Sequence, residues 1–418
     1  MVRTSRVAPV TVCLGVCASA CAQPQFYGVG HLPPMPESRV DGVGIGGVAT
    51  GYLSSPSGPP WYVFRWTPGS GMQQISSTPG YATALTPDGQ TIVGSMSNAG
   101  SSYWEPFRWT PGTGPQFIGN LSTWWPGGAA RAVSADGQTI AGYAYISNFH
   151  IRAFRWTPAT GMQNLGTLPG LFDPGSEANA ISADGQVIVG SSSLQIMVAT
   201  RWDSAGIHSL GSIPGAPSQW SNAYGANADG SVIVGQSNSP GSVYQAFRWT
   251  AGTGMVGLGT LPGAEASSAS EVSYDGRIVL GWSGPRYVPE EQVAMIWTPA
   301  GMRSVDSELT ALGVTAHQGW SLRHATTISP DARWIGGHGI NPQGQREGWV
   351  AYVGDLYCYA NCDGSITPPR LNVADFACFL ASYVGGDLYA NCDGSTTLPM
   401  LNISDFTCFL QKFAAGCP

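Results

Sequence analysis

Short runs of alternating apolar and polar residues, separated by glycine and proline, repeat along most of the chain. A representative stretch, residues 180–190, reads AISADGQVIVG, with apolar runs on both sides of an Asp-Gly turn signal. Two further runs follow in each copy, of the form AFRW and MxxLGxL. Runs of this length that are rich in β-branched and aromatic residues are typical of strands. Each copy therefore predicts four strands, which is the make-up of one β-propeller blade.

The copies can be counted from two markers. The Asp-Gly marker occurs at Asp88, Asp136, Asp184, Asp229 and Asp275, with weaker copies at Asp41 and Asp331. A tryptophan follows each marker, at Trp66, Trp109, Trp156, Trp202, Trp249, Trp297 and Trp349. Asp-Gly predicts a two-residue hairpin between the first two strands, because glycine supplies the positive φ that such a turn needs. The pattern predicts seven blades and an all-β fold over residues 23–354.

The two ends of the repeat region complement each other. The seventh unit ends near Val353 without a fourth strand, whereas residues 27–33 match residues 163–169, which form a fourth-strand segment. The first strand of the mature chain is therefore predicted to complete the last blade and to close the ring without exposed sheet edges.

Composition, charge and the N-terminal sequence limit the expected cellular location and the expected binding partners. The 418 residues include 57 Gly and 31 Pro, only 10% are charged, and the formal net charge is −7. An acidic chain without basic runs makes nucleic acid an unexpected partner. Arg3 and Arg6, an apolar run and the sequence Ala20-Cys21-Ala22 predict a signal peptide over residues 1–22. The alternative is a lipoprotein signal acylated on Cys21. No later stretch is apolar and long enough to span a membrane, so an extracellular or cell-surface location is expected.

The repeat motifs resemble a known family. FRWTPxTGMxxLGxLPG together with SADGxxIVG is similar to the HAF repeats of probable extracellular proteins, and residues 319–344 resemble the end of those proteins. The resemblance implies export and extends over the whole repeat region. It implies no activity, because the family carries none that could be transferred.

Aromatic residues gather in the segments that differ between copies. If the short first–second and third–fourth turns share one face of the ring, the variable second–third and fourth–first connections share the other, and binding residues are more common in such loops. The candidate ligand-binding residues on this variable face are Trp104, Trp124, Trp125, Tyr143, Tyr145, Trp220, Trp282 and Trp320, with Tyr103 and Tyr287 beside them. They could stack on sugar rings or bind a protein, or they could plug the central channel and cover the blade ends.

Catalysis has little support in the residue pattern. The Asp of each Asp-Gly pair and the Arg before each Trp recur once per blade, so we assign both to the scaffold. The acids outside the repeat pattern are Glu105, Glu177, Glu265, Glu290, Glu291, Asp306 and Glu308. Two of them facing each other could form a glycosidase pair, but spacing alone does not show this. Ligand-spaced His, Gly-x-Ser-x-Gly and Walker-type motifs are absent from the sequence.

Residues 355–418 contain a duplication with a period of 30 residues. Each copy joins a turn-rich loop to a short helix, with Phe376, Phe379, Leu380 and Tyr383 at helical spacing in the first copy and Phe406, Phe409, Leu410 and Phe413 in the second. This tail resembles a dockerin, whose halves are EF-hand-like. The resemblance implies calcium ligands at Asn361, Asp363, Ser365, Asn372 and Asp375, and at Asn391, Asp393, Ser395, Asn402 and Asp405. Each loop is longer than the EF-hand pattern and begins with Tyr, so a loop organised by disulfides alone is the alternative.

All six cysteines after the predicted signal lie in this tail, which suggests three disulfides in an oxidising compartment. Six cysteines allow fifteen pairings. The duplication favours Cys362 with Cys378 and Cys392 with Cys408, which leaves Cys358 and Cys417 to join the ends. The dockerin resemblance implies a cohesin-like receptor on a scaffold or cell surface.

Two hypotheses for function follow from the sequence. The first is a monomeric, non-catalytic binding or display module, anchored by its tail, whose aromatic face binds a glycan or a protein. The second is a secreted carbohydrate-active enzyme, a glycosidase or lyase, of a polysaccharide-degrading complex.

Overall fold

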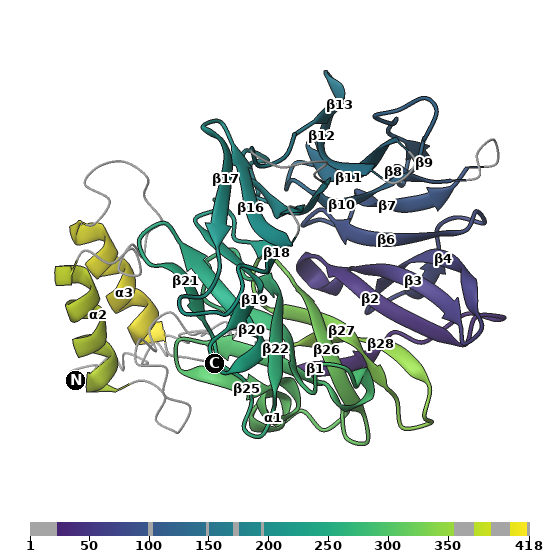
Figure 1. Cartoon of the computed structure of the whole chain (residues 1–418). Helices are drawn as coiled ribbons and strands as arrows, with labels where there is room; N and C mark the ends of the chain where they lie inside the picture. The colour runs from purple at the N-terminus through teal and green to yellow at the C-terminus, as the bar shows by residue number, and fades with distance from the viewer. Residues whose placement is uncertain are drawn as a thin grey trace, which may run out of the picture.

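The computed structural model describes residues 23–98, 103–147, 150–169, 175–193, 196–354, 372–385 and 402–415. Within them the repeat region forms seven antiparallel sheets of four strands each. The first strands of consecutive blades contact one another around the whole ring, including the contact between the first and the seventh blade. The colour changes steadily from blade to blade in Figure 1, so sequential repeats are neighbours in space. The predicted seven-bladed propeller is confirmed.

Four strand positions recur in each blade. The first, innermost strands are β2 (Glu37–Val43), β6 (Gly80–Leu85), β10 (Gly128–Val133), β14 (Gly175–Ile181), β18 (Ser221–Ala226), β22 (Ala266–Val272) and β26 (Ser321–Ile328). The second strands are β3 (Ala49–Ser55), β7 (Ile92–Ser97), β11 (Ile140–Ser147), β15 (Ile188–Ser193), β19 (Val232–Ser239), β23 (Val279–Gly284) and β27 (Trp334–Ile340). The third strands are β4 (Gly58–Thr67), β8 (Trp104–Thr110), β12 (His150–Thr157), β16 (Met197–Asp203), β20 (Ser242–Thr250), β24 (Val293–Thr298) and β28 (Arg346–Tyr352). The outermost strands are β5 (Gly71–Gln74), β9 (Gly114–Phe117), β13 (Gly161–Asn164), β17 (Gly206–Gly211), β21 (Gly254–Gly257), β25 (Gly301–Ser304) and β1 (Gln25–Gly28).

The ring closes as the sequence predicts. Strand β1 takes the outer position of the seventh blade and pairs antiparallel with β28, from Gln25 opposite Tyr352 to Gly28 opposite Trp349. Figure 1 shows purple β1 next to the green strands of the seventh blade, where its neighbour is β28. The chain therefore joins its first described strand to its last blade, and this pairing covers the edge that β28 would otherwise expose.

One glycine per blade follows from the geometry of the inner strand. Each inner strand contains a β-bulge, and the Gly of the T-I-V-G run lies opposite it, as Gly142 lies opposite Ala130 in the third blade. A Cβ on Gly142 would approach the Ala129 carbonyl oxygen to 2.0 Å, and the equivalent glycines meet the same obstacle. Any larger residue would have to push the two strands apart, so the scaffold requires glycine here.

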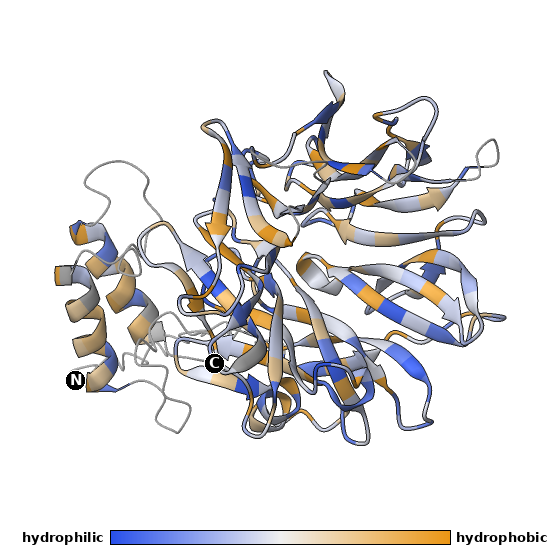
Figure 2. Ribbon diagram, in the orientation of Figure 1, coloured by the Kyte–Doolittle hydropathy of each residue, from blue (hydrophilic) through white to orange (hydrophobic). Residues whose placement is uncertain are grey.

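The blade core is built on the third strand. The fully buried Phe64, Phe107, Phe154 and Phe247 lie opposite these glycines. Trp349 occupies the same place in the seventh blade, opposite Gly337. The sequence-based alignment of Trp349 with the repeated Trp is therefore wrong by two positions, and Ala351 stands where the other blades have Trp. Figure 2 shows the resulting change between hydrophobic and hydrophilic residues along the strands.

The Asp-Gly turns are longer than the predicted two-residue hairpins. In the third blade the amide of Ser134 donates to the carbonyl of Thr139, so four residues form the turn. Asp136 Oδ1 accepts from the Ser134 hydroxyl at 2.6 Å and from the Gln138 amide at 2.9 Å. Gly137 has a φ of 70°. These contacts confirm that the repeated Asp is a structural residue.

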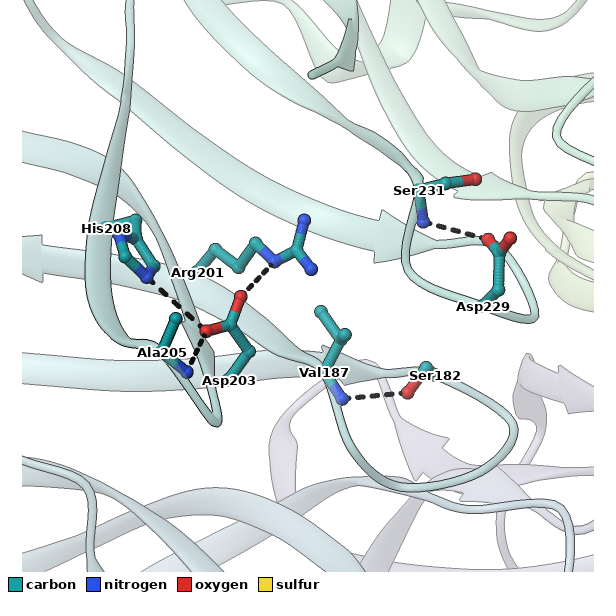
Figure 3. Close-up of polar contacts among 8 residues, drawn as sticks. All are labelled: Ser182, Val187, Arg201, Asp203, Ala205, His208, Asp229 and Ser231. Atoms are coloured by element: carbon teal, nitrogen blue, oxygen red, sulfur yellow. Dashed lines mark hydrogen bonds and ion pairs between the residues drawn. The ribbon is translucent and has the colours of Figure 1, made fainter.

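Figure 3 shows variants of this scaffold in the fourth and fifth blades, where Ser182 Oγ accepts from the Val187 amide and Asp229 accepts from the Ser231 amide. The third–fourth turn of the fourth blade is organised by Asp203, which accepts from the Ala205 amide at 2.8 Å and pairs with Arg201 at 2.8 Å. The repeated Arg at position 65 instead donates to the Gly89 carbonyl of the next blade. Both arginines therefore support the scaffold.

Replacing Asp136 by Ala should lower the free energy of unfolding by about 1 kcal/mol, because two hydrogen bonds of the turn are lost. The Ser134 hydroxyl and the Gln138 amide hold the pKa of Asp136 below its ordinary value. Its contribution is therefore present above the unfolded pKa and disappears as the pH falls through the folded pKa. Urea unfolding at several pH values checks this. Asp136→Asn keeps the acceptor oxygen and should restore most of the stability without the pH dependence; equal stability of Asp136→Ala and the native chain would contradict the assignment.

Three short helical elements and two longer helices complete the described structure. The 3-10 turns are η1 (Ile45–Gly47) and η2 (Pro289–Glu291), and helix α1 (Val305–Ala311) connects the sixth blade to the seventh. In the tail, α2 (Val373–Gly385) and α3 (Ile403–Ala415) confirm the predicted helix of each duplicated copy. Their fully buried Phe379 and Phe409 stack at a centroid distance of 4.0 Å. The tail residues between them lie outside the described part of the chain.

Candidate functional site

The seven inner strands surround a central channel of about 710 Å³. Each of these strands skips a residue at the x of the A-x-A motif in its pairing with the second strand, and β26 also skips Arg323. The bulged residues at the x position are Asp41, Thr83, Arg131, Asn179, Tyr224, Ser270 and Thr326. All seven line the channel. In each blade, therefore, one residue whose type the repeat does not fix lines the same cavity.

The two ends of the channel differ in polarity. Every inner strand starts on the face of the variable connections and ends at an Asp-Gly turn. Near the turns the channel is lined by apolar residues, Val43, Leu85, Val133, Ile181, Val272 and Ile328. Backbone hydrogen bonds join neighbouring blades there, for example from the Ala135 amide to the Ala183 carbonyl at 2.9 Å. Polar and aromatic groups are found toward the variable face, so that face holds the candidate site.

Eight partly buried aromatic side chains form a continuous band at this mouth. The members of this aromatic band are Tyr52, Trp61, Tyr81, Tyr103, Trp104, Trp125, Tyr143 and Tyr145. Trp61 contacts Trp104 edge-to-face at 5.6 Å, and Tyr81 stacks on Trp104 at 5.7 Å. Burial, and then the nearby Tyr143, raise the pKa of Tyr81 above its ordinary value, so these rings adjoin the rest of the band. Aromatic groups from the first three blades thus adjoin one another, and Tyr52, Trp61 and Tyr81 among them line the channel.

Four of the eight predicted binding residues belong to this band: Trp104, Trp125, Tyr143 and Tyr145. Trp125 and Tyr145 both contact the ring of Tyr103, at 6.0 and 6.5 Å. Trp124 is 85% exposed. Trp282 lines the opposite side of the channel, at 5.9 Å from the ring of His324.

The other two predicted residues lie elsewhere. Trp220 packs at 4.4 Å against Tyr244, whose other side carries the Arg286 guanidinium at 3.7 Å. Trp320 contacts Phe26 edge-to-face at 5.2 Å and packs against the core of the closing blade. Trp320 therefore covers a blade end, the structural alternative that the sequence left open for these residues.

Ion pairs offset most of the charge inside the mouth. Arg39 Nε lies 2.7 Å from Asp41 Oδ1, and the attraction of Asp41 raises the pKa of Arg39. Arg131 lies 3.5 Å from Glu177 and 5.2 Å above the ring of Tyr143. Burial lowers the pKa of His324 to about 4, so this imidazole is neutral at physiological pH.

Glu271 differs from these paired groups. Its carboxyl lines the channel in the sixth blade, and burial raises its pKa to about 8. The carboxyl is therefore mostly protonated at neutral pH. Two of the acids singled out in the sequence have different surroundings: Glu105 accepts from Asn98 and Asn120, and Glu308 pairs with Arg303 at 3.0 Å. These contacts assign Glu105 and Glu308 to the scaffold.

Sequence reasoning missed the channel residues that lie on strands. The sequence does not mark Tyr52, Trp61, Tyr81, Tyr224 and Glu271, because binding residues were expected in or beside the variable connections and these five belong to strands. For Tyr224 a signal was present: it is the x of A-x-A, which changes from blade to blade inside an otherwise repeated motif. Variation confined to one strand position indicates a side chain that is free of packing constraints.

The predicted calcium ligands are only partly covered by the structure. Asn361, Asp363, Ser365, Asn391, Asp393 and Ser395 lie outside the described residues. Asn372 and Asp375 form the start of α2, where Asp375 Oδ2 accepts from the Asn372 amide at 2.8 Å, and Asn402 and Asp405 repeat this arrangement in α3. One carboxylate oxygen of each Asp thus caps a helix, and calcium binding stays a prediction.

The disulfide pairings also stay predictions, because Cys358, Cys362, Cys392 and Cys417 lie outside the described residues. In the part of the chain that the structure describes, no group of three or more His, Cys, Asp or Glu side chains could hold a metal ion. None of the described helices has the length and the apolar character needed to cross a membrane.

The topology of the sheets defines the chain as a seven-bladed β-propeller. No family model matches the sequence, and no curated protein matches it. Similar solved structures include TolB from Acinetobacter baumannii, with 16% identity and a TM-score of 0.40 over 62% of this chain and 61% of that one. The β-propeller domain of the Trilobed protease from Pyrococcus furiosus has 10% identity and a TM-score of 0.48, over 75% and 95% of the two chains. The chain thus spans less than two thirds of the length of that TolB.

Proposed function

We propose that the protein is a secreted or cell-surface binding module that presents the mouth of its propeller channel to a glycan. The observation that carries this proposal is the aromatic band, in which side chains of three adjacent blades stand half-buried beside a polar channel. Partly exposed Trp and Tyr rings offer flat apolar faces to the C–H groups of sugar rings. The paired charges of Arg39 with Asp41 and Arg131 with Glu177 provide hydrogen-bonding groups at the same mouth.

The export signal and the dockerin-like tail are part of the same proposal. An exported chain with a tail of this kind would attach to a cohesin-like receptor on a scaffold or cell surface, and the tail could bind calcium. Attachment through one domain leaves the channel mouth of the other available to ligand. The duplicated loop-helix sequence and the confirmed helices α2 and α3 support this arrangement.

Removing two rings of the aromatic band should weaken glycan binding. In the double variant Trp61→Ala, Trp104→Ala we expect at least about a tenfold increase in Kd for a glycan identified on an array, because two stacking faces are lost. Isothermal titration calorimetry on the mature chain measures this. Phe117→Ala is the matched control, since this aromatic ring is 43% exposed and lies on the outer strand β9, outside the band. Equal loss in the control, or none in the double variant, would show that the band is not the site.

A second candidate function is a secreted glycosidase or lyase. It is favoured by one observation: the protonated Glu271 carboxyl in the channel could serve as a general acid at neutral pH. Incubation of the same glycans with the protein, followed by product analysis, separates the two functions. Turnover that is lost in Glu271→Gln would favour the enzyme, and binding without product favours the binding module.

A further inference from the structure

Glu271 breaks the repeat at a position that is otherwise small. The residue that resumes pairing after the bulge is Gly42, Ala84, Ala132, Ala180, Gly225, Glu271 or Thr327 in the seven blades. Small residues fit here because equivalent positions of adjacent blades lie close together: a Cβ on Gly42 would lie 3.4 Å from Ala84 Cα. Only the sixth blade has an ionisable group at this position, so Glu271 is not explained by the repeated scaffold.

The neighbouring blade makes room for this carboxyl. Gly225 stands at the same position in the fifth blade, where the first blade also has Gly and four other blades have Ala or Thr. A Cβ on Gly225 would lie 3.0 Å from Glu271 Cα and 3.1 Å from Glu271 Oε1. The glycine and the glutamate are therefore complementary, and together they place a carboxyl group in the wall of the channel.

The carboxyl has no charged partner within the described structure. Glu271 Oε1 accepts a hydrogen bond from the Val272 amide at 3.1 Å, and among the described residues no Arg or His forms an ion pair with it. Burying a carboxyl without a cation is unfavourable, and this explains why its pKa is raised. Aromatic groups line the same side of the channel, namely Tyr224, Tyr274 and Trp282.

We infer that Glu271 makes the channel selective for a ligand that carries an ammonium group, and that this ligand is a glycan with free amino groups. This inference rests on the proposed glycan-binding function and deepens it. An ammonium ion supplies the charge partner that Glu271 lacks and gains attraction from the surrounding aromatic rings. A neutral sugar would gain no comparable advantage from the Glu271 carboxyl over the amide of a Gln at the same position.

Binding should depend on pH through Glu271. The titratable groups that face this part of the channel from the packed strands are Tyr224 on β18, Tyr274 beyond the end of β22 and His324 on β26. Burial raises the pKa of both tyrosines to about 12 and lowers that of His324 to about 4, so all three stay neutral between pH 6 and 9. Glu271 is then the group among them that gains charge as the pH rises. A cation of fixed charge should bind more tightly in its ionised form.

The test uses the mature chain, Glu271→Gln and Glu290→Gln. Glu290→Gln is the matched control, because it makes the same substitution at an exposed residue of η2 that does not line the channel. Calorimetric titrations at pH 7 use tetraglucosamine, its fully N-acetylated counterpart and trilysine. We expect tetraglucosamine to bind the native chain and Glu290→Gln equally, and Glu271→Gln at least about tenfold more weakly. Choline, titrated from pH 6 to pH 9, should bind the native chain up to about 100-fold more tightly at the higher pH, with no such change in Glu271→Gln.

The outcomes separate this inference from the proposed function. Equal binding of tetraglucosamine to the native chain and to Glu271→Gln would overturn the role of Glu271. Trilysine binding that requires Glu271, without binding of tetraglucosamine, would overturn the amino-sugar assignment in favour of a protein ligand. Choline binding that requires Glu271, without binding of any glycan, would overturn the glycan function and still support a cation site.

Discussion

Deletion of residues 23–33 should open the ring and destabilise the propeller by several kcal/mol. The segment supplies the whole outer strand of the seventh blade. Its Phe26 is 7% exposed and lies 6.0 Å from the ring of Trp349 in a stacked arrangement. Truncation of one such buried ring costs about 3–5 kcal/mol, and the deletion also leaves the backbone of β28 without its partner.

Urea unfolding and size-exclusion chromatography measure this effect. Phe26→Ala separates the two contributions, because it keeps the backbone pairing and removes only the ring. A synthetic peptide of residues 23–33 should restore stability to the truncated chain by adding a strand to the exposed edge. A truncated chain that stays monomeric with the native melting temperature would be incompatible with closure by β1.

The architecture was predictable because its determinants are local and repeated. The alternation of apolar residues, the Asp-Gly turns and the displaced fourth strand at residues 27–33 each carry their own signal, and seven copies reinforce one another. The register of the last blade was not predictable in the same way. Trp349 looks like the repeated Trp by its spacing from Asp331, but the pairing with Gly337 shows that it fills the place of Phe.

The candidate site was only half predictable for a physical reason. Variable loops can be recognised in the sequence because their length differs between repeats. Trp104, Trp125, Tyr143 and Tyr145 were predicted because they lie in or beside such loops. The channel is lined instead by strand residues that the bulge turns toward the axis, and a bulge leaves no mark on composition. Glu271 gains its properties from a partner in another blade, Gly225, and sequence spacing does not show that contact.

The helix pair of the tail should depend on one aromatic contact. Phe379 on α2 and Phe409 on α3 are both 0% exposed, and their rings stack at 4.0 Å with an angle of 13° between their planes. Phe376 lies 6.2 Å from the ring of Phe409 and extends the contact. In a unit this small, loss of one buried ring, about 3–5 kcal/mol, is comparable to the whole stability that a single core supplies.

We therefore expect Phe379→Ala to unfold the helix pair without affecting the propeller. Hydrogen exchange with mass spectrometry on the full chain measures both parts at once: peptides from residues 372–385 and 402–415 should lose protection, and those from β2 to β28 should keep it. Val384→Ala is the matched control, because this side chain of the same helix is 85% exposed. Full protection of both helices in Phe379→Ala would mean that other contacts of the tail, such as its predicted disulfides, hold the helices without the stacked rings.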